Sequence, residues 1–334
     1  MKILIVGPEL IIKNGRYMDE KSWSFMKAFE RAGIETEYFA YRLQGMFRFV
    51  ESDKQLKKLR HRIINRRILS YVKQTKPDIL ALFKGGSITA DTLRKIRETT
   101  GTIIINIMND NPMLMGNFNA IFPCHYYFVK DTYVLEGLRK IGLRNIHYLP
   151  QCANHHIRKP VKLDAADIEM FSSDIMLMGS MYPYRLRFVE ELMDFRPALW
   201  GKGWARADNA GILKLYKGRE IWGVDKTKAI CGAAVSLNPH HPLNDIRGTQ
   251  SRTFDIAACG GFQLSEYKED MEDLFKIGEE IICYRTIDEL RKLLKYYLLH
   301  PDERREISLA GQKRVLKDHT YDERARQILA MVNN

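Results

Sequence analysis

The stretch DIMLMGSMYPYR, residues 174–185, decides how the chain is divided. An apolar run of strand length ends at Gly179, a short polar turn follows, and Arg185 lies where the next helical segment opens. The chain begins in the same way, because KILIVG, residues 2–7, is an apolar run that ends at Gly7. Two strands that each end in glycine ahead of a loop and a helix predict two Rossmann-like α/β halves.

Short apolar runs alternate with longer amphipathic ones along the whole chain, which is typical of parallel sheets built from βαβ units. Further strands are predicted at residues 34–39, 78–83, 102–108, 125–130 and 145–150, and then at 198–201, 233–238, 261–266 and 280–284. Thr286 and Glu289 form a capping box that predicts a helix start. We place an N-terminal domain at residues 1–155, a C-terminal domain at 170–318, and at 319–334 a C-terminal helix able to cross back to the first domain.

The composition favours two domains in a reducing compartment. At 334 residues the chain exceeds the size of one ordinary core. Hydrophobic residues make up 45% and charged residues 28%, as in soluble globular proteins. The sequence has no apolar run of about 20 residues that would span a bilayer, and its start has no signal-peptide pattern. Five scattered cysteines without a C-x-x-C pair indicate free thiols, so we expect a cytoplasmic protein.

The formal net charge of +12 is concentrated in KQLKKLRHRIINRR, which runs from Lys54 to Arg67 and contains no acid. One interpretation is a helix with a solvated basic face, because apolar residues at helical spacing predict a buried side: Leu56, Leu59, Ile63 and Ile64. The other interpretation is peripheral contact with an anionic membrane or an acidic polymer. No nucleic-acid-binding motif accompanies the segment, so we do not expect nucleic acid as a partner.

Several cofactor and nucleophile motifs are absent from the sequence. The first strand is followed by Gly7 and Gly15 but by no G-x-G-x-x-G, and the chain has neither a G-x-x-x-x-G-K-[ST] loop nor a G-x-S-x-G elbow. The paired histidines at 155–156 and 240–241 lack metal-ligand spacing. The single carboxylate of NDN at 109–111 is a poor clamp for a divalent cation. We therefore expect neither a cofactor nor a metal.

The stretch SRTFDIAACGG, residues 251–261, is predicted to form a helix that starts at a strand end and stops abruptly. Ser251 is a good N-cap, and the first turn would then hold Arg252, Thr253 and Asp255. Helix-start N–H groups favour an anion, and Arg252 offers a planar fork for phosphate oxygens. The carboxylate of Asp255 matches the adjacent hydroxyls of a ribose. Alternatively, Asp255 only complements the helix dipole.

A second turn compatible with phosphate lies in MGSMYPYR, residues 178–185. Gly179 and Ser180 end the strand there, and Arg185 opens the next helix. An ordinary turn has the same pattern. Two such turns at neighbouring strand ends nevertheless support one anion-binding site, because ligands of open α/β sheets bind at the carboxyl ends of the strands.

These motifs resemble those of one glycosyltransferase family. RTFDIAACGGF, EDLFKIGEEIICY, DELRKLLKYYLLHPDERREIS and AGQKRVLKDHTYDERARQIL look like the C-terminal half of the CgeB-like glycosyltransferases, as do GSMYPYR and GKGW. In the first half, KPDILALFKGG, NDNP and YLPQCANHH match more thinly. The resemblance implies a GT-B fold of two Rossmann-like domains facing across a cleft, with the acceptor on the first domain and the nucleotide-sugar donor on the second.

The activity that the resemblance implies is transfer of a sugar, in the hexosyltransferase class, from a nucleotide-diphosphate sugar to a surface glycan, a lipid-linked glycan or a protein. Arginines and the helix start would hold the diphosphate without a metal. Asp255 would hold the ribose, and Trp204 would lie either along the nucleotide or in the core. The implied donor-binding residues are Gly179, Ser180, Arg185, Trp204, Arg247, Ser251, Arg252, Thr253 and Asp255.

One position departs from the related retaining enzymes. Those enzymes have a Glu-x7-Glu motif. By resemblance, Asp255 of this chain occupies the second position of that motif, but the first position is occupied by Arg247, which is not an acid. Retention of configuration is therefore not carried over. If the reaction inverts, Asp19 or Glu20 is a candidate base, although each alternatively caps the next helix. Asp110 is a further candidate base or ligand of the acceptor hydroxyl, and alternatively a turn residue.

Two other functions would use the same donor pocket. A GT-B-fold sugar-nucleotide epimerase would consume the donor without an acceptor. A non-catalytic nucleotide-sugar-binding protein would bind the donor and turn over nothing.

Overall fold

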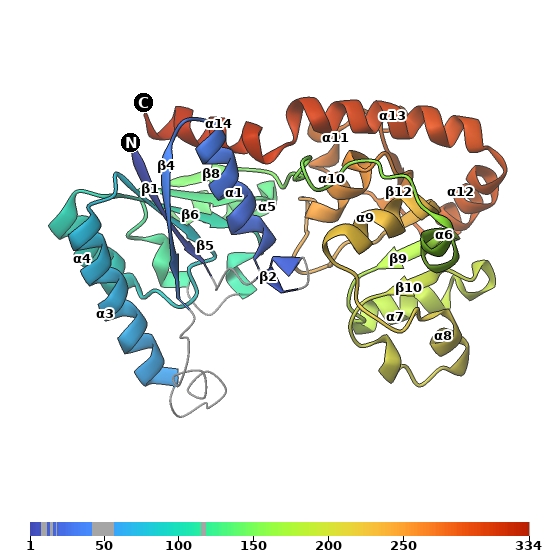
Figure 1. Cartoon of the computed structure of the whole chain (residues 1–334), viewed down its shortest axis with the longest axis horizontal. Helices are drawn as coiled ribbons and strands as arrows, with labels where there is room; N and C mark the ends of the chain where they lie inside the picture. Colours follow the sequence, from blue (N-terminus) through green and yellow to red (C-terminus); the bar gives the residue numbers. More distant parts are fainter. Residues whose placement is uncertain (8–11, 14–15, 18, 42–56, 115–117, 334) are drawn as a thin grey trace. The chain divides into compact units, whose positions relative to one another are not determined.

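The computed structural model describes residues 1–7, 12–13, 16–17, 19–41, 57–114 and 118–333. The chain divides into two compact units (Figure 1). Unit 1 comprises Met1–Pro150, Leu243–Arg247 and Tyr321–Asn334, and unit 2 comprises Gln151–Pro242 and Gly248–Thr320. Within the described ranges, no helix is both long enough and apolar enough to cross a membrane.

Unit 1 is built on a six-stranded parallel sheet with the order β4-β1-β5-β6-β7-β8. Because β4 pairs on one side of β1 and β5 on the other, the chain changes direction across the sheet between β1 and β5, where open α/β sheets bind ligands. The strands are β1 (Lys2–Gly7), β4 (Glu35–Ala40), β5 (Ile79–Phe83), β6 (Ile103–Met108), β7 (Tyr126–Val129) and β8 (Ile146–Tyr148), and a short antiparallel pair is formed by β2 (Ile12–Lys13) and β3 (Arg16–Tyr17).

Helices pack on both faces of this sheet (Figure 1). Val6 of β1 and Ile64 of α3 lie in one hydrophobic core. The Phe25 ring of α1 lies 5.2 Å from that of Phe83 and 4.9 Å from that of Tyr321 in α14, centroid to centroid. The last helix therefore completes the core of unit 1. The helices are α1 (Glu20–Arg31), α3 (Lys57–Thr75), α4 (Ala90–Thr100), α5 (Thr132–Lys140) and α14 (Tyr321–Val332).

The basic segment forms α3, so the predicted helix is confirmed, but its predicted buried side is only partly correct. Ile64, Ile68 and Val72 are buried, whereas Leu59 is 48% exposed. The packed stripe is displaced toward the C-terminus because the helix continues to Thr75, well beyond the basic run. Lys54, Gln55 and Leu56 lie outside the described residues.

Unit 2 is built on a five-stranded parallel sheet with the order β10-β9-β11-β12-β13. Strand β9 is the first strand of this unit. It pairs with β10 on one side and with β11 on the other, so the chain changes direction across the sheet between β9 and β11. The strands are β9 (Ser173–Met178), β10 (Ala198–Trp200), β11 (Ala233–Asn238), β12 (Gln263–Glu266) and β13 (Ile282–Tyr284).

The alternating side chains of β9 build a core on each face of this sheet. Ile175 and Leu177 pack with α7 and α12, and Met176 and Met178 pack with α9 and α10. This alternation is expected of a strand that is covered on both faces. The helices of unit 2 are α6 (Ala165–Phe171), α7 (Pro183–Glu190), α8 (Ala210–Leu215), α9 (Gly223–Gly232), α10 (Ser251–Ala258), α11 (Met271–Leu274), α12 (Ile287–Leu299) and α13 (Pro301–Asp318).

The predicted fold class is confirmed. Every predicted strand is present with bounds that differ by at most two residues. The first half of the predicted capping box is present, because the Glu289 amide donates to Thr286 Oγ1 at 3.2 Å at the start of α12. The Glu289 carboxylate accepts from the Arg285 amide at 2.7 Å, one residue before the N-cap. Both sheets have the parallel order of doubly wound α/β folds.

The core of unit 2 is testable at Leu177, which is fully buried. Leu177→Ala should lower the free energy of unfolding by about 2–5 kcal/mol, because it removes buried methyl groups and leaves a cavity. Leu213 of α8, which is 42% exposed, is the matched control. Leu213→Ala should change that free energy by less than about 0.5 kcal/mol. Urea denaturation followed by circular dichroism compares the two, and equal effects would contradict this core.

Candidate functional site

The carboxyl ends of β9 and β11 form the switch point of unit 2, where the chain leaves one strand for each side of the sheet. Gly179 and Ser180 follow β9, and Pro239 and His240 follow β11. Loops that leave such a point in opposite directions open a crevice, and ligands of this fold class bind there. The two turns that the sequence singled out both lie at this edge of the sheet.

Two guanidinium groups converge on Gly179. Its φ of +137° is a backbone conformation that favours glycine. A Cβ atom at this position would lie 2.7 Å from Arg252 Nη2 and 2.9 Å from Arg185 Nη1, so any side chain would displace both arginines. The structure therefore brings together three predicted donor-site residues, and the absence of a side chain at Gly179 makes that possible.

Arg185 is held in place by neighbours on its own turn. Its side chain is 3% exposed, its Nη1 donates to the carbonyl oxygen of Ser180, and its Nη2 donates to Tyr184 Oη at 2.7 Å. The guanidinium carbon lies over the rings of Tyr182 and Tyr184, 5.5 Å and 5.2 Å from their centroids. The hydrogen bonds to Ser180 and Tyr184 fix the orientation of the guanidinium before any ligand binds.

Trp204 lies in the core. Its side chain is fully buried among the residues that pack under α7 and α12, and its Nε1 donates to the carbonyl oxygen of Gly179 at 2.9 Å. A ring without exposed surface offers no face to a nucleotide. Of the two predicted positions for Trp204, the structure shows the core position, from which the indole supports the Gly179 turn.

The start of α10 differs from the prediction. Gln250, not Ser251, is the N-cap residue, and the helix has no side-chain cap. The Gln250 amide instead donates to Asn238 Oδ1 at 3.0 Å and to the carbonyl oxygen of Pro239 at 2.9 Å, which anchors this residue to the end of β11. Thr253 is fully buried and accepts a hydrogen bond from Asn238 Nδ2 at 3.0 Å. Gln250 and Thr253 therefore position the helix start.

Asp255 lies beyond the first turn of α10 and is buried in an ion-pair cluster. Its side chain is 7% exposed, and its Oδ2 lies 2.5 Å from Lys226 Nζ of α9. Its Oδ1 lies 3.7 Å from Arg158 Nε. The alternative of simple dipole complementation in the first turn is wrong, because the first turn holds no acid. Sequence reasoning missed Lys226 and Arg158, which belong to no recognisable motif.

Arg247 belongs to unit 1, together with the rest of Leu243–Arg247. Its Nη1 lies 3.0 Å from Glu136 Oε2, and its guanidinium carbon lies 5.7 Å from the ring centroid of Tyr133. Its backbone amide donates to Asp131 Oδ2 at 3.1 Å. The contacts of Arg247 are thus made with α5 and its N-cap in unit 1.

Asp110 follows β6 in unit 1 and forms an ion pair with Lys84, which follows β5. Asn244 Nδ2 donates to Asp110 Oδ1 at 3.4 Å. Burial alone would raise the pKa of Asp110, but the charge and hydrogen bond of Lys84 outweigh it, so the pKa lies below its ordinary value. A carboxylate of lowered pKa is a weak proton acceptor, and this one is better suited to holding a hydroxyl.

Asp19 and Glu20 lie at the switch point of unit 1. A Cβ atom on Gly7 would lie 2.9 Å from Asp19 Oδ2 and 2.8 Å from Ser22 Oγ, so the glycine admits both side chains to the end of β1. Ser22 donates its hydroxyl hydrogen to Asp19. The Asp19 side chain makes no capping hydrogen bond to the helix backbone, although the residue occupies the N-cap position of α1. Glu20 is the first residue of that helix.

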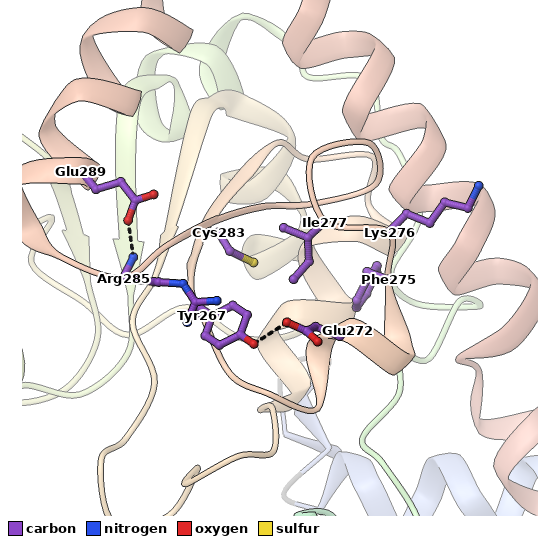
Figure 2. A pocket seen from close by; sticks show the side chains of 8 residues that line it. All are labelled: Tyr267, Glu272, Phe275, Lys276, Ile277, Cys283, Arg285 and Glu289. Carbon is purple, nitrogen blue, oxygen red and sulfur yellow. Dashed lines mark hydrogen bonds between the residues drawn. The ribbon is translucent and has the colours of Figure 1, made fainter.

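A separate pocket of about 500 Å³ lies at the carboxyl ends of β12 and β13 (Figure 2). The Arg285 guanidinium carbon lies 3.3 Å from the ring centroid of Tyr267, and Tyr267 donates to Glu272 Oε1 at 2.5 Å. Both acidic and basic side chains line it, so its charge favours no single class of ligand. The lining residues are Tyr267, Glu272, Phe275, Lys276, Ile277, Cys283, Arg285 and Glu289.

Two comparisons with known sequences show what this chain is similar to. Residues 185–330 match the glycosyl transferase-like family. The chain is 26% identical over 272 residues to spore protein CgeB of Bacillus subtilis strain 168, a match that covers 76% of this chain and 83% of that protein.

Two solved structures share the fold across the whole chain. HepE from Anabaena, in complex with UDP, superposes with a TM-score of 0.66 at 10% identity and full coverage of both chains. Sucrose-phosphate synthase from Thermosynechococcus elongatus superposes with a TM-score of 0.70 at 11% identity, covering 99% of this chain and 98% of that one.

The fold is therefore of the GT-B type that these solved structures share. In sequence the chain is similar to the CgeB spore protein, so the resemblance that the sequence motifs indicated is confirmed.

The Asp255 cluster has a measurable consequence for stability. Asp255→Ala should lower the free energy of unfolding by about 3–5 kcal/mol, because it leaves Lys226 and Arg158 without their buried counter-charge. Asp194, which pairs with Arg291 and is 55% exposed, is the control. Asp194→Ala should cost about 1 kcal/mol or less, as exposed pairs do. Urea denaturation measures both, and equal costs would contradict a buried, compensated cluster.

Proposed function

We propose that the chain is a glycosyltransferase that transfers a sugar, in the hexosyltransferase class, from a nucleotide-diphosphate sugar to a hydroxyl of an acceptor glycan, lipid-linked glycan or protein. The convergence of Arg185 and Arg252 on Gly179 at the switch point carries this proposal. The CgeB similarity supports it, as do the structures of HepE with UDP and with UDP-glucose.

In this proposal the two guanidinium groups hold the diphosphate. The bond between the anomeric carbon and the phosphate oxygen breaks, and the acceptor oxygen forms the new bond to that carbon. Negative charge then grows on the departing diphosphate, and the two cations stabilise it, with Arg185 already oriented by Ser180 and Tyr184. Fixed cations at this position take the role that a metal ion has elsewhere, so the proposed reaction needs neither a metal nor a cofactor.

The nucleoside end of the donor is proposed to lie at Asp255 and Lys226. These residues belong to α10 and α9, and Asp255 lies one helical turn after Arg252, so the two side chains emerge on the same side of α10. The Asp255 carboxylate would accept hydrogen bonds from the ribose hydroxyls. The acceptor is proposed to bind unit 1, with Asp110 holding its hydroxyl and the hydroxyl proton passing to Asp19 or Glu20.

Arg252→Ala tests the donor site. The variant should bind its nucleotide sugar about 10- to 100-fold more weakly, because a hydrogen bond to a charged group contributes about 1.5–3 kcal/mol. Arg187, which lies on α7 and is 85% exposed, is the matched control, and Arg187→Ala should bind normally. A thermal-shift screen of UDP, GDP, dTDP, ADP and CMP sugars finds the donor, since a ligand of the native state raises its stability. Calorimetry then measures affinity.

Three outcomes of the same work would separate the rival functions. Consumption of the donor without an acceptor would indicate the epimerase. Binding without turnover, with every acceptor class supplied, would indicate a non-catalytic binding protein. Unchanged donor affinity in Arg252→Ala would overturn the proposed site, and loss of transfer on addition of EDTA would overturn metal independence.

The basic residues of α3 are proposed to make peripheral contact with an anionic membrane, consistent with a cytoplasmic enzyme that acts on a membrane-borne acceptor. Lys58, Arg62 and Arg66 are exposed on this helix, and its first turn has no acid. Each basic side chain close to an anionic surface contributes about 1 kcal/mol.

Charge reversal of Lys58 and Arg62 to glutamate should therefore weaken binding to phosphatidylserine-containing vesicles at least about tenfold, from the contribution of about 1 kcal/mol for each residue. Reversal of the exposed Lys292 and Lys295 on α12 is the control and should have a smaller effect. Vesicle sedimentation at low salt measures both, and equal losses would show that net charge rather than α3 determines binding.

A further inference from the structure

A cluster of aromatic rings spans the switch point of unit 2. Tyr182 and Tyr184 follow β9, and their rings are nearly parallel, with centroids 5.9 Å apart and planes at 10°. His241 follows β11 and meets both rings edge-on, with centroids 5.5 Å from Tyr182 and 5.2 Å from Tyr184. The two loops that diverge from the switch point are thus joined by these three side chains.

Arg185 connects this ring cluster to the proposed phosphate site. Its Nη1 is the nitrogen that faces the Cβ position of Gly179, and its Nη2 donates to Tyr184 Oη at 2.7 Å. One guanidinium group therefore has one edge toward the phosphate site and the other toward the rings. A diphosphate bound between Arg185 and Arg252 would place whatever is attached to it within reach of the cluster.

Among the described residues, Tyr182 lies outside the hydrophobic cores of unit 2. Its side chain is 45% exposed, and it is not among the residues that pack in the cores of unit 2. It occupies the N-cap position of α7 but makes no capping hydrogen bond. A large ring that remains half exposed at the edge of a ligand-binding crevice is typical of a contact surface for a ligand.

We infer that Tyr182 and His241 form the subsite for the transferred sugar, with the Tyr182 ring face stacked on the C–H face of a pyranose ring. This inference rests on the proposed donor site. A nucleotide sugar carries its nucleoside and its sugar at opposite ends of the diphosphate. The nucleoside end is proposed to lie at Asp255, which follows Arg252 on α10. The aromatic rings lie next to the other arginine, Arg185, and so on the side proposed for the sugar.

The chemistry of the two side chains suits a sugar. The face of an aromatic ring is electron-rich and attracts the weakly positive C–H groups that one face of a pyranose presents. The imidazole of His241 and the phenol of Tyr182 each offer hydrogen bonds to hydroxyls at the rim of the same surface. Tyr184 acts through Arg185, to which it is bonded, and is a positioning residue.

Tyr182→Ala tests the inference through two affinities. UDP, GDP, dTDP and ADP are each titrated beside their glucose or mannose conjugates by calorimetry. The affinity of the variant for the free diphosphate should stay within about twofold of the wild type. Its affinity for the sugar conjugate should fall about 5- to 50-fold, the range expected for loss of one stacking contact. Tyr182→Phe should restore most of that affinity.

Tyr296 of α12, which is 46% exposed, is the matched control, and Tyr296→Ala should leave both affinities unchanged. Equal losses for the free diphosphate and its sugar conjugate would overturn the inference, because the ring would then orient Arg185 or stack on the base. Unchanged affinity for the conjugate would overturn it as well. If the wild-type protein bound no diphosphate and no conjugate, the proposed function itself would fail, and the subsite with it.

Discussion

The turn at Gly179 is the constraint on which the proposed donor site depends. Its carbonyl oxygen is held from the core by Trp204 Nε1, and a side chain at Gly201 would overlap that same carbonyl group. On its other side the missing side chain leaves room for Arg185 and Arg252. One residue therefore connects the packing of the hydrophobic core to the position of two charges. Glycine is required for steric reasons at Gly179, where a side chain would meet the two arginines, and at Gly201, where it would meet the Gly179 carbonyl group.

The two arginines explain why this turn should bind an anion. Since Arg185 Nη1 and Arg252 Nη2 lie 2.9 Å and 2.7 Å from one point, the two nitrogens are less than about 6 Å apart. Two like charges at that separation repel by roughly 3 kcal/mol at an effective dielectric constant of about 20. The carbonyl oxygen of Ser180 and the hydroxyl of Tyr184 offset part of this cost. The negative charges of a diphosphate would attract both guanidinium groups. The repulsion between the two arginines would thereby be offset when the ligand binds.

The fold and part of the site could be predicted because their signals are local. The alternation of short apolar runs with amphipathic ones, and the glycines that end the first strand of each half, predict both sheets. The positions of Gly179, Arg185 and Arg252 near the ends of neighbouring strands predict that they meet. Contacts between distant elements could not be predicted. Nothing in the sequence around Lys226 indicates Asp255 as its partner, and the N-cap moved from Ser251 to Gln250 because the Gln250 amide binds the end of β11. The exposure of Leu59, the burial of Trp204 and the place of Arg247 in unit 1 likewise depend on packing that only the folded chain defines.

The ion-pair cluster at Asp255 is compatible with a role in ribose binding for a geometric reason. Its carboxylate has two oxygens that together provide about four acceptor sites. Lys226 approaches one oxygen and Arg158 the other, so ribose hydroxyls can be accepted beside these cations without displacing them. Keeping Lys226 and Arg158 in place also keeps the position of the carboxylate fixed. The buried counter-charges that stabilise unit 2 would thereby preorganise Asp255 for the nucleoside, which joins folding stability and donor recognition in one residue.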